Sequence, residues 1–211
     1  MNIAQHKIIP LITLLLATGC SALLPKPPIN TAYYSLNNRQ VETQASKGVN
    51  INNAMPTLIV NTPKAAAGFD TRHMMYTRSP YQLEYFARSE WIDTPPNMLQ
   101  PLMVAAIEQT QAFNAVLPKL TAVKADLRLE SEVIKLVQDF NTKPSVLQFT
   151  LRATIIDNTT GKIVALREFS EHVITVSDDP LGGVKAANQA VNNVLKQLGM
   201  FCTEAASRLG Q

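Results

Sequence analysis

The sequence predicts a single α/β domain in which helices pack on a mixed, largely antiparallel sheet. Three observations lead to this prediction. Several short apolar or alternating segments follow one another as candidate strands, a helix-like segment interrupts them after residue 93, and a second helix-like segment ends the chain. Strands and helices in such a series form a sheet covered by helices. Roughly 190 residues remain after a leader, and these are enough for one such domain.

The first candidate strands lie on either side of a polar stretch. Residues 33–36 are expected to form a short strand, and residues 37–55, rich in Asn, Gln, Ser and Thr, a loop. Residues 57–60 are an apolar run between turn-like neighbours, which is typical of a buried strand.

Residues 69–77 and 81–91 are expected to form a hairpin about Ser79-Pro80. The second of these segments alternates with a period of two, so one of its faces should be buried. The expected core face consists of Tyr81, Leu83, Tyr85, Ala87 and Trp91. Trp91 could instead anchor a partner, since Trp is frequent in interface hot spots. The alternation favours the core.

A first helix should begin near Asp93–Asn97, with Thr94 or Asn97 as the capping residue. Pro101 must lie in its first turn or kink it. The apolar stripe of this helix contains Leu99, Leu102, Met103, Ala106, Ile107 and Phe113.

Three longer strands are expected next. Residues 125–140 alternate in part, although residues 131–139 are also compatible with a helix. Residues 146–156 alternate clearly. A strong turn signal, Asp157 to Gly161, then separates them from a partner strand at residues 163–176.

The last helix follows Asp178-Asp179-Pro180, an acidic start with a Pro near the first turn. Its apolar stripe contains Val184, Ala187, Val191, Val194, Leu195, Leu198 and Cys202. Leu99, Val191 and Leu195 are therefore expected in the core with Trp91. Cys202 is expected to be a buried small side chain, and the alternative is an unpaired reactive thiol.

Residues 1–19 have the features of a secretory signal peptide. Lys7 precedes an apolar run, residues 8–17, that is too short to span a bilayer as a helix. The segment at the end of this run reads Leu16, Ala17, Thr18, Gly19 and Cys20. It resembles a lipobox, the site where bacterial lipoproteins are cleaved and acylated. Leu lies one position earlier than is usual. The alternative is an ordinary signal peptide that happens to end near a Cys.

Acylation of Cys20 would anchor the protein firmly, because two or more acyl chains already give stable membrane binding. Ser21 follows, which resembles the sorting signal for the outer membrane, facing the periplasm, rather than an inner-membrane retention signal. Residues 20–32 contain a Pro-rich tether, and residues 33–211 the domain. Prolines in this number favour an extended spacer.

Composition and motifs argue against several classes of function. The chain has 19 basic and 16 acidic residues, a balance too weak to indicate nucleic-acid binding. It contains neither a phosphate-binding Gly-rich loop nor a Gly-x-Ser-x-Gly motif. His73 and His172 lack the spacing of metal ligands. We therefore expect no enzyme activity, no metal and no cofactor.

Several short motifs follow one another along the chain. They are Tyr34-Ser35-Leu36, Arg72-His73-Met74-Met75-Tyr76, Leu83-Glu84-Tyr85-Phe86-Ala87, Trp91-Ile92-Asp93-Thr94-Pro95-Pro96 and Met98-Leu99. Together with the lipobox and the Ala- and Val-rich final helix, this order resembles the ABC-type transport auxiliary lipoproteins, and in particular their paraquat-inducible protein C branch.

The resemblance implies an α/β sandwich similar to the TolB amino-terminal domain. It also implies a non-catalytic subunit that docks a membrane-tethered MCE-domain protein, the lipid-carrying part of an ABC transporter, at the outer membrane. The expected partners are that protein and outer-membrane lipid through Cys20, and a homo-oligomer is left open. The alternatives are a free lipid-binding carrier, with an apolar cavity of its own, and a purely structural envelope lipoprotein.

Overall fold

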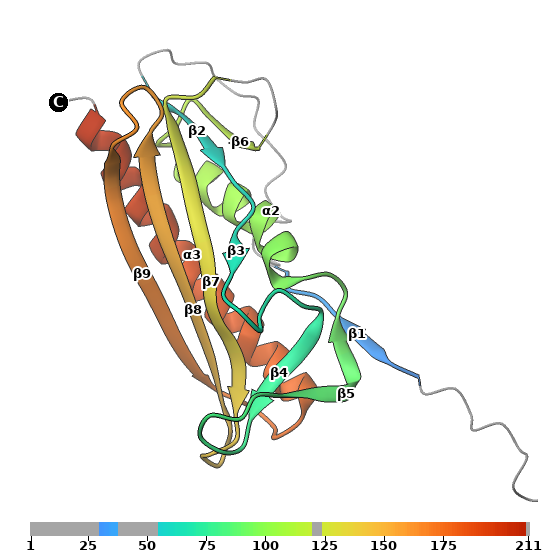
Figure 1. Ribbon diagram of the computed structural model, residues 1–211. Coiled ribbons are helices and arrows are strands. Elements are labelled where there is room, and N and C mark those ends of the chain that lie inside the picture. The colour runs from blue at the N-terminus through green and yellow to red at the C-terminus, as the bar shows by residue number, and fades with distance from the viewer. Residues whose placement is uncertain (1–29, 38–54, 120–123, 210–211) are drawn as a thin grey trace, which may run out of the picture. The chain divides into compact units, whose positions relative to one another are not determined.

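The computed structural model describes residues 30–37, 55–119 and 124–209. A compact unit begins at Thr31. Its described residues form one sheet and two helices, α2 and α3 (Figure 1). The elements are β1 (Ala32–Tyr34), β2 (Thr57–Val60), β3 (Lys64–Ala65), β4 (His73–Thr77), β5 (Glu84–Trp91), α2 (Pro95–Glu108), β6 (Ala115–Pro118), β7 (Leu127–Asp139), β8 (Val146–Asp157), β9 (Ile163–Ile174) and α3 (Pro180–Leu209).

The long strand β7 organises the sheet. On one side it pairs antiparallel with β8, which in turn pairs antiparallel with β9. On its other side three short strands, β2, β3 and β4, pair with it in parallel, one after another along its length. β6 extends the sheet beyond β2, while β5 and then β1 extend it beyond β4. The prediction of a mixed sheet with packed helices is confirmed.

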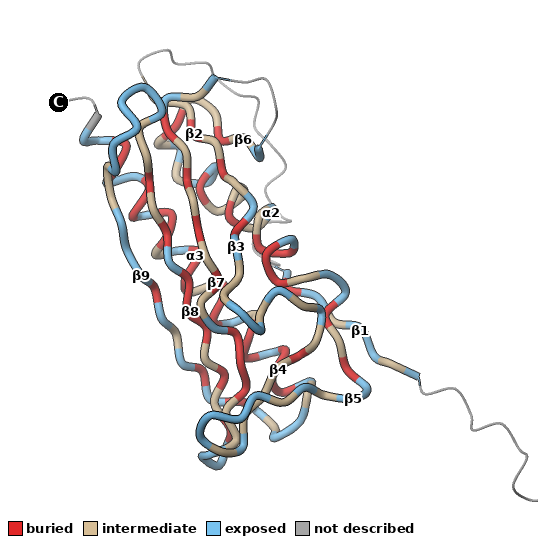
Figure 2. The backbone as a smooth tube through the Cα atoms, in the orientation of Figure 1, coloured by how far each residue is buried: buried red, intermediate tan, exposed pale blue. Residues whose placement is uncertain are grey.

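The core lies between the sheet and the two helices, which both pack on the same face (Figures 1 and 2). α3 packs on β8 and β9 and also contacts α2, while α2 reaches β2, β6 and β7. Leu99 of α2 and Val191 and Leu195 of α3 are buried, as expected from their helical spacing. Cys202 is buried as well, and its burial raises the pKa of the thiol to about 12.

β7 is a single strand, so the helical alternative for residues 131–139 is wrong. The ambiguity has a physical cause in a register shift between Val133 and Lys135. Val133 and Leu136 both face the core, because the extra residue reverses the alternation between them. A spacing of three between buried residues is what a helix would also produce.

A larger irregularity in β5 corrects the expected core face of residues 81–91. Trp91 is buried, but Tyr81, Leu83, Tyr85 and Ala87 are exposed, so their assignment to the core was wrong. Glu90 pairs with His73, and Tyr85 with Met75, so β5 advances five residues where β4 advances two. The odd difference turns Tyr85 to the face opposite Trp91. Tyr81 lies before the strand, in the connection from β4.

Other boundaries differ from the expectations at segment ends. The hairpin is confirmed as the antiparallel pair of β4 and β5, but β4 begins only at His73. The short strands β3 and β6 were not predicted. Helix α2 ends at Glu108, so Phe113 is a buried residue beyond it.

At the start of α2, Thr94 occupies the N-cap position without a side-chain capping bond. The Asp93 carboxylate instead accepts hydrogen bonds from the Thr94 amide, at 2.6 Å, and from the Asn97 side chain, at 3.1 Å. These bonds, that of Asn97 above all, hold the pKa of Asp93 below its usual value. Pro101 lies within the helix.

Candidate functional site

The residues expected for processing, lipidation and sorting lie outside the described part of the chain. They are Leu16, Ala17, Thr18, Gly19, Cys20 and Ser21. Most of the expected tether, residues 20–32, and nearly all of the expected loop, residues 37–55, lie outside it too. The candidate functional site is therefore a surface of the domain itself.

β1 and the β4–β5 hairpin, which are distant in the sequence, place one cluster of exposed and half-exposed side chains side by side. In β1, Tyr33 pairs with Glu90 of β5, and Glu90 pairs in turn with His73 of β4. Residues opposite each other on neighbouring strands point to the same face of a sheet. Arg72 precedes β4, and the irregularity in β5 adds Tyr85 to this face. We call these five residues, Tyr33, Arg72, His73, Tyr85 and Glu90, the aromatic face.

The side chains of the aromatic face hold one another in place. The Arg72 guanidinium lies 5.3 Å from the centre of the Tyr33 ring, within the range of a cation–π contact. The rings of His73 and Tyr85 stack with their centres 4.3 Å apart. The Glu90 carboxylate lies 3.8 Å from Arg72 and 3.7 Å from His73 Nδ1. Tyr33 and Tyr85 nevertheless remain 56% and 55% exposed, so both rings are available to a partner.

The backbone behind the aromatic face is fixed by hydrogen bonds. Trp91 N–H donates to the Arg72 carbonyl at 2.8 Å, and Arg72 Nε donates to the Trp91 carbonyl at 3.2 Å. Ile92 N–H donates to the Tyr34 carbonyl at 2.7 Å and so ties β1 to the residue after β5. With Trp91 buried directly behind it, the surface is preorganised, which reduces the entropy that binding would cost.

A second cluster supports the start of β5, in the β4–β5 hairpin. The Glu84 carboxylate accepts hydrogen bonds from Arg78 and from the Tyr76 hydroxyl, the latter at 3.0 Å. The bond from Arg78 is the main reason that the pKa of Glu84 is lowered, while burial raises the pKa of Tyr76. The Tyr76 ring also packs on Phe86 and Phe140.

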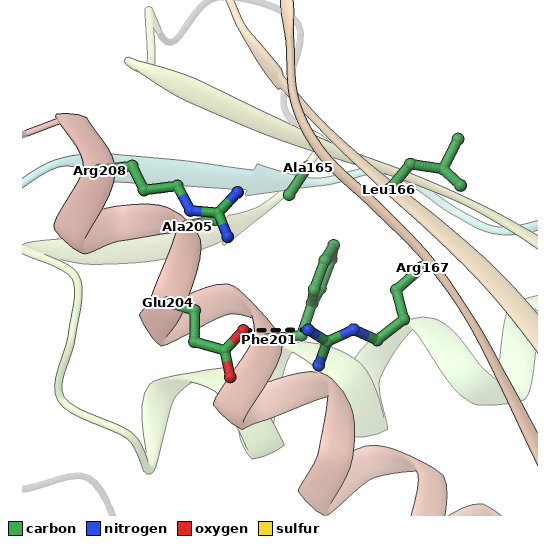
Figure 3. Close-up of a pocket in the computed structure, with 7 residues that line it drawn as sticks. All are labelled: Ala165, Leu166, Arg167, Phe201, Glu204, Ala205 and Arg208. Atoms are coloured by element: carbon green, nitrogen blue, oxygen red, sulfur yellow. Dashed lines mark hydrogen bonds and ion pairs between the residues drawn. The ribbon is translucent and has the colours of Figure 1, made fainter.

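Two cavities lined by described residues are small. One of about 90 Å³ lies between β9 and the end of α3 (Figure 3). Another, of about 10 Å³, lies beside Trp91 and Gly183. Ligand pockets usually measure about 300–1,000 Å³. Neither cavity can therefore enclose the acyl chains of a phospholipid.

The described residues show neither a metal-binding cluster nor a membrane-spanning helix. No three or more His, Cys, Asp or Glu side chains there gather in a way that could hold a metal ion. None of the helices described is both long and apolar enough to cross a membrane.

Comparison with solved structures confirms the fold. Protein XCC0632 from Xanthomonas campestris is 21% identical, with a TM-score of 0.71, and the match covers 84% of this chain and 98% of that one. A second structure, of an uncharacterised protein, is 13% identical, with a TM-score of 0.63, and the match covers 82% and 99% of the two chains. Comparison with curated protein sequences gives no match.

The family comparison agrees with the motifs of the sequence. The model of the ABC-type transport auxiliary lipoprotein component matches residues 34–199. This range runs from β1 into α3 and so includes α2, the first two thirds of α3, the whole sheet apart from its first residues, and all of the aromatic face except Tyr33. The chain therefore belongs to the family of ABC-type transport auxiliary lipoprotein components.

Proposed function

We propose that this protein is a non-catalytic docking subunit of an MCE-type ABC lipid-transport system, anchored by lipid in the outer membrane and facing the periplasm. Its family supports an auxiliary lipoprotein role. The leader, Cys20 and Ser21 support the anchor and its location in the outer membrane. The partner in this role is a periplasmic MCE-domain protein whose gene lies beside that of this protein.

The aromatic face is the observation on which the docking role rests. Tyr and Arg are enriched among the residues that dominate binding energy at protein interfaces. Here two exposed Tyr rings and Arg72 are held in fixed positions by neighbouring strands. Such a surface suits a protein partner better than the interior of a bilayer, because Arg72 and Glu90 carry charges.

The position of this face in the chain also fits the proposal. Eleven residues separate Cys20 from Ala32, the first residue of β1. An extended Pro-rich segment covers about 3.1 Å per residue, so this tether would span about 34 Å. A partner that crosses the periplasm would meet the aromatic face close to the outer membrane.

The alternative of a free lipid carrier receives less support. A carrier must shield acyl chains from water, and the cavities described above are several times too small for that. A bound phospholipid in native mass spectrometry of the purified protein would favour the carrier. A co-purified MCE-domain protein would favour docking.

The docking role is tested by measuring the affinity of the mature protein for the MCE-domain protein encoded with it. Tyr33→Ala and Tyr85→Ala should each remove a hot-spot side chain, at a cost of about 2 kcal/mol or roughly a 30-fold weaker Kd. Tyr81→Ala is the matched control, since Tyr81 is fully exposed and lies outside the aromatic face. Equal effects of all three substitutions, or no binding by the folded wild-type protein, would refute the proposal.

The anchor is tested separately with Cys20→Ala. This variant should be soluble or uncleaved, whereas the wild-type protein should fractionate with the outer membrane and carry the mass of its acyl chains. Membrane fractionation of the variant at an unchanged mature mass would contradict the anchor. Deleting the protein should also weaken the envelope against detergents or redox-active compounds.

A further inference from the structure

Strand β9 forms an open edge of the sheet. It pairs with β8 over its whole length, from Ile163 to Ile174, and no other strand of the described residues pairs with its outer side. An unpaired edge presents a row of free backbone N–H and C=O groups. Among the described residues, Arg208 covers part of this edge through a weak contact with the Val164 carbonyl at 3.5 Å.

This edge has some of the features that usually limit pairing and lacks others. Natural edge strands are blunted by charged side chains, Lys above all, and by Pro, short length or bulges. β9 carries charges at Arg167, Glu168 and Glu171, but it has twelve residues, contains neither Lys nor Pro, and has its register irregularity only in its first residues. Ile163, Leu166 and Ile174 are all exposed along it, and Figure 2 shows much of the strand at the surface. The edge is therefore suited to accept a strand whose charges complement its own.

The side chains on the two faces of β9 have different surroundings. On the helix side, Arg167 lies 3.0 Å from Glu204 of α3, and the Phe169 ring packs on Phe201. Glu171 lies on the same side, where it accepts hydrogen bonds from two amides of α3. Figure 3 shows Leu166 pointing to the opposite side from Arg167.

We propose that β9 pairs antiparallel with β9 of a second copy of this chain, about a two-fold axis at Phe169. Residues that face each other across such an axis must lie at equal distances from its centre and on the same face. With Phe169 at the centre, Arg167 faces Glu171 of the other copy, Ala165 faces Val173, and Glu168 faces Ser170. The two sheets then join into one.

Charge favours this register over its two neighbours. Moving the axis by one residue to Glu168 places two Glu carboxylates opposite each other, whereas moving it by one residue to Ser170 opposes no like charges but leaves Arg167 facing Val173 and Glu171 facing Phe169. Like charges in direct opposition destabilise a strand pair. In the proposed register Arg167 of each copy faces Glu171 of the other copy, so this contact forms once on each side of the axis. Among the described residues Glu171 has amide partners but no cationic one, so this contact would neutralise it.

The cavity between β9 and α3 lies along the same edge. Ala165 and Arg167 line it from the strand, and Phe201, Ala205 and Arg208 line it from the helix (Figure 3). In the proposed register Val173 of the second copy lies beside Ala165, next to this cavity. Leu166 and Ile174 are exposed along the same edge, so pairing would bury apolar surface as well as satisfy the backbone of the edge.

The test is cysteine crosslinking of full-length protein expressed in the envelope. Glu168→Cys and Ser170→Cys face each other only between copies, where opposite Cβ atoms of an antiparallel pair lie about 4.5–5.5 Å apart. Co-expressed as two single-cysteine variants, they should yield a covalent dimer on mild oxidation, with up to about half of the chains crosslinked because half of randomly formed dimers are mixed.

Each variant expressed alone should crosslink far less, because identical residues lie diagonally across the pair. The control is Glu132→Cys co-expressed with Ser170→Cys, since Glu132 is accessible but lies two strands inward on β7. Cys20 is present in every sample, and Cys202 is buried. A mixed sample that crosslinks no more than this control would overturn the proposal. Equal crosslinking by Glu168→Cys alone would overturn the register and with it the two-fold axis.

Discussion

Replacing Trp91 and Tyr85 separately with alanine tests the change of face within β5. Both side chains occupy odd positions of one alternating segment, so simple alternation predicts that the two substitutions cost the same. The register shift against β4 predicts instead that one residue belongs to the core and the other to the surface. The two variants are matched in strand, in residue class and in the change made.

The expected magnitudes differ severalfold. Trp91 is only 3% exposed, and truncating a buried Trp costs about 3–5 kcal/mol. Tyr85 is 55% exposed, and its ring contact is the stack on His73, so its loss should cost about 1 kcal/mol. In a domain of this size 1 kcal/mol corresponds to roughly 2–4 °C in Tm. Trp91→Ala should therefore lower Tm by about 10 °C, and Tyr85→Ala by about 3 °C.

Thermal unfolding followed by circular dichroism gives the Tm values, and urea titration gives the free energies of unfolding. An unchanged m-value would show that the unfolded ensemble is the same in each variant. Tyr81→Ala is the surface control and should stay within about 0.5 kcal/mol of the wild type. Comparable losses for Trp91→Ala and Tyr85→Ala would refute the assignment of the two faces, and a loss confined to Tyr85→Ala would reverse it.

Three further predictions concern α3 and its entrance. Gly182→Ala should destabilise the domain by about 1–3 kcal/mol in urea titration, although Ala favours a helix, because its Cβ would lie 2.1 Å from the Ser177 carbonyl oxygen; higher stability would contradict this. The Cys202 thiol, with a pKa of about 12, should resist alkylation at pH 8 until urea unfolds the protein, as followed by peptide mass spectrometry; rapid labelling of native protein would contradict its burial. Asp178 accepts a hydrogen bond from Ser145, and Asp179 accepts one from the Gly182 amide, and these bonds lower the pKa of each carboxyl. The stability that they give the fold is therefore complete above the usual pKa of 3.8 and is lost as the pH falls through the lower pKa values of the folded state. Urea midpoints at pH 7 and pH 3 measure this loss, and Asp179→Asn should reduce it; an unchanged difference in the variant would contradict the role of Asp179.

The long elements could be predicted because their signals are local. The alternation of β8, the turn after Asp157 and the stripe of α3 each lie within a single stretch of sequence. β3 and β6 could not be found in this way. β3 has two residues and owes its strand geometry to pairing with Glu132 and Val133 of β7. Such a pairing depends on the tertiary structure and leaves no periodic pattern in the segment itself.

The aromatic face was missed for a related reason. Tyr33, His73 and Glu90 lie far apart in the sequence and meet because β1 joins β5 in parallel and β5 joins β4 in a hairpin. No local pattern encodes the parallel pair. The one local signal, the aromatic alternation of residues 81–91, led to the wrong face for Tyr85, since it assumed an uninterrupted register.

The irregularity in β5 also bears on the proposed docking role. A regular strand would have placed Tyr85 on the side of Trp91, where its ring would add buried area to the core. The extra residues turn it outward instead, so that it stacks on His73 beside Arg72 and Tyr33. Bulges often re-aim side chains near functional sites. An exposed Tyr also stabilises the fold less than a buried one would. The Tyr85 ring is held in a defined position rather than left in solvent. We therefore infer that binding of a partner to the aromatic face compensates for the buried area that the core loses. If the aromatic face has no partner, restoring the regular register by shortening β5 should raise stability without loss of any binding activity.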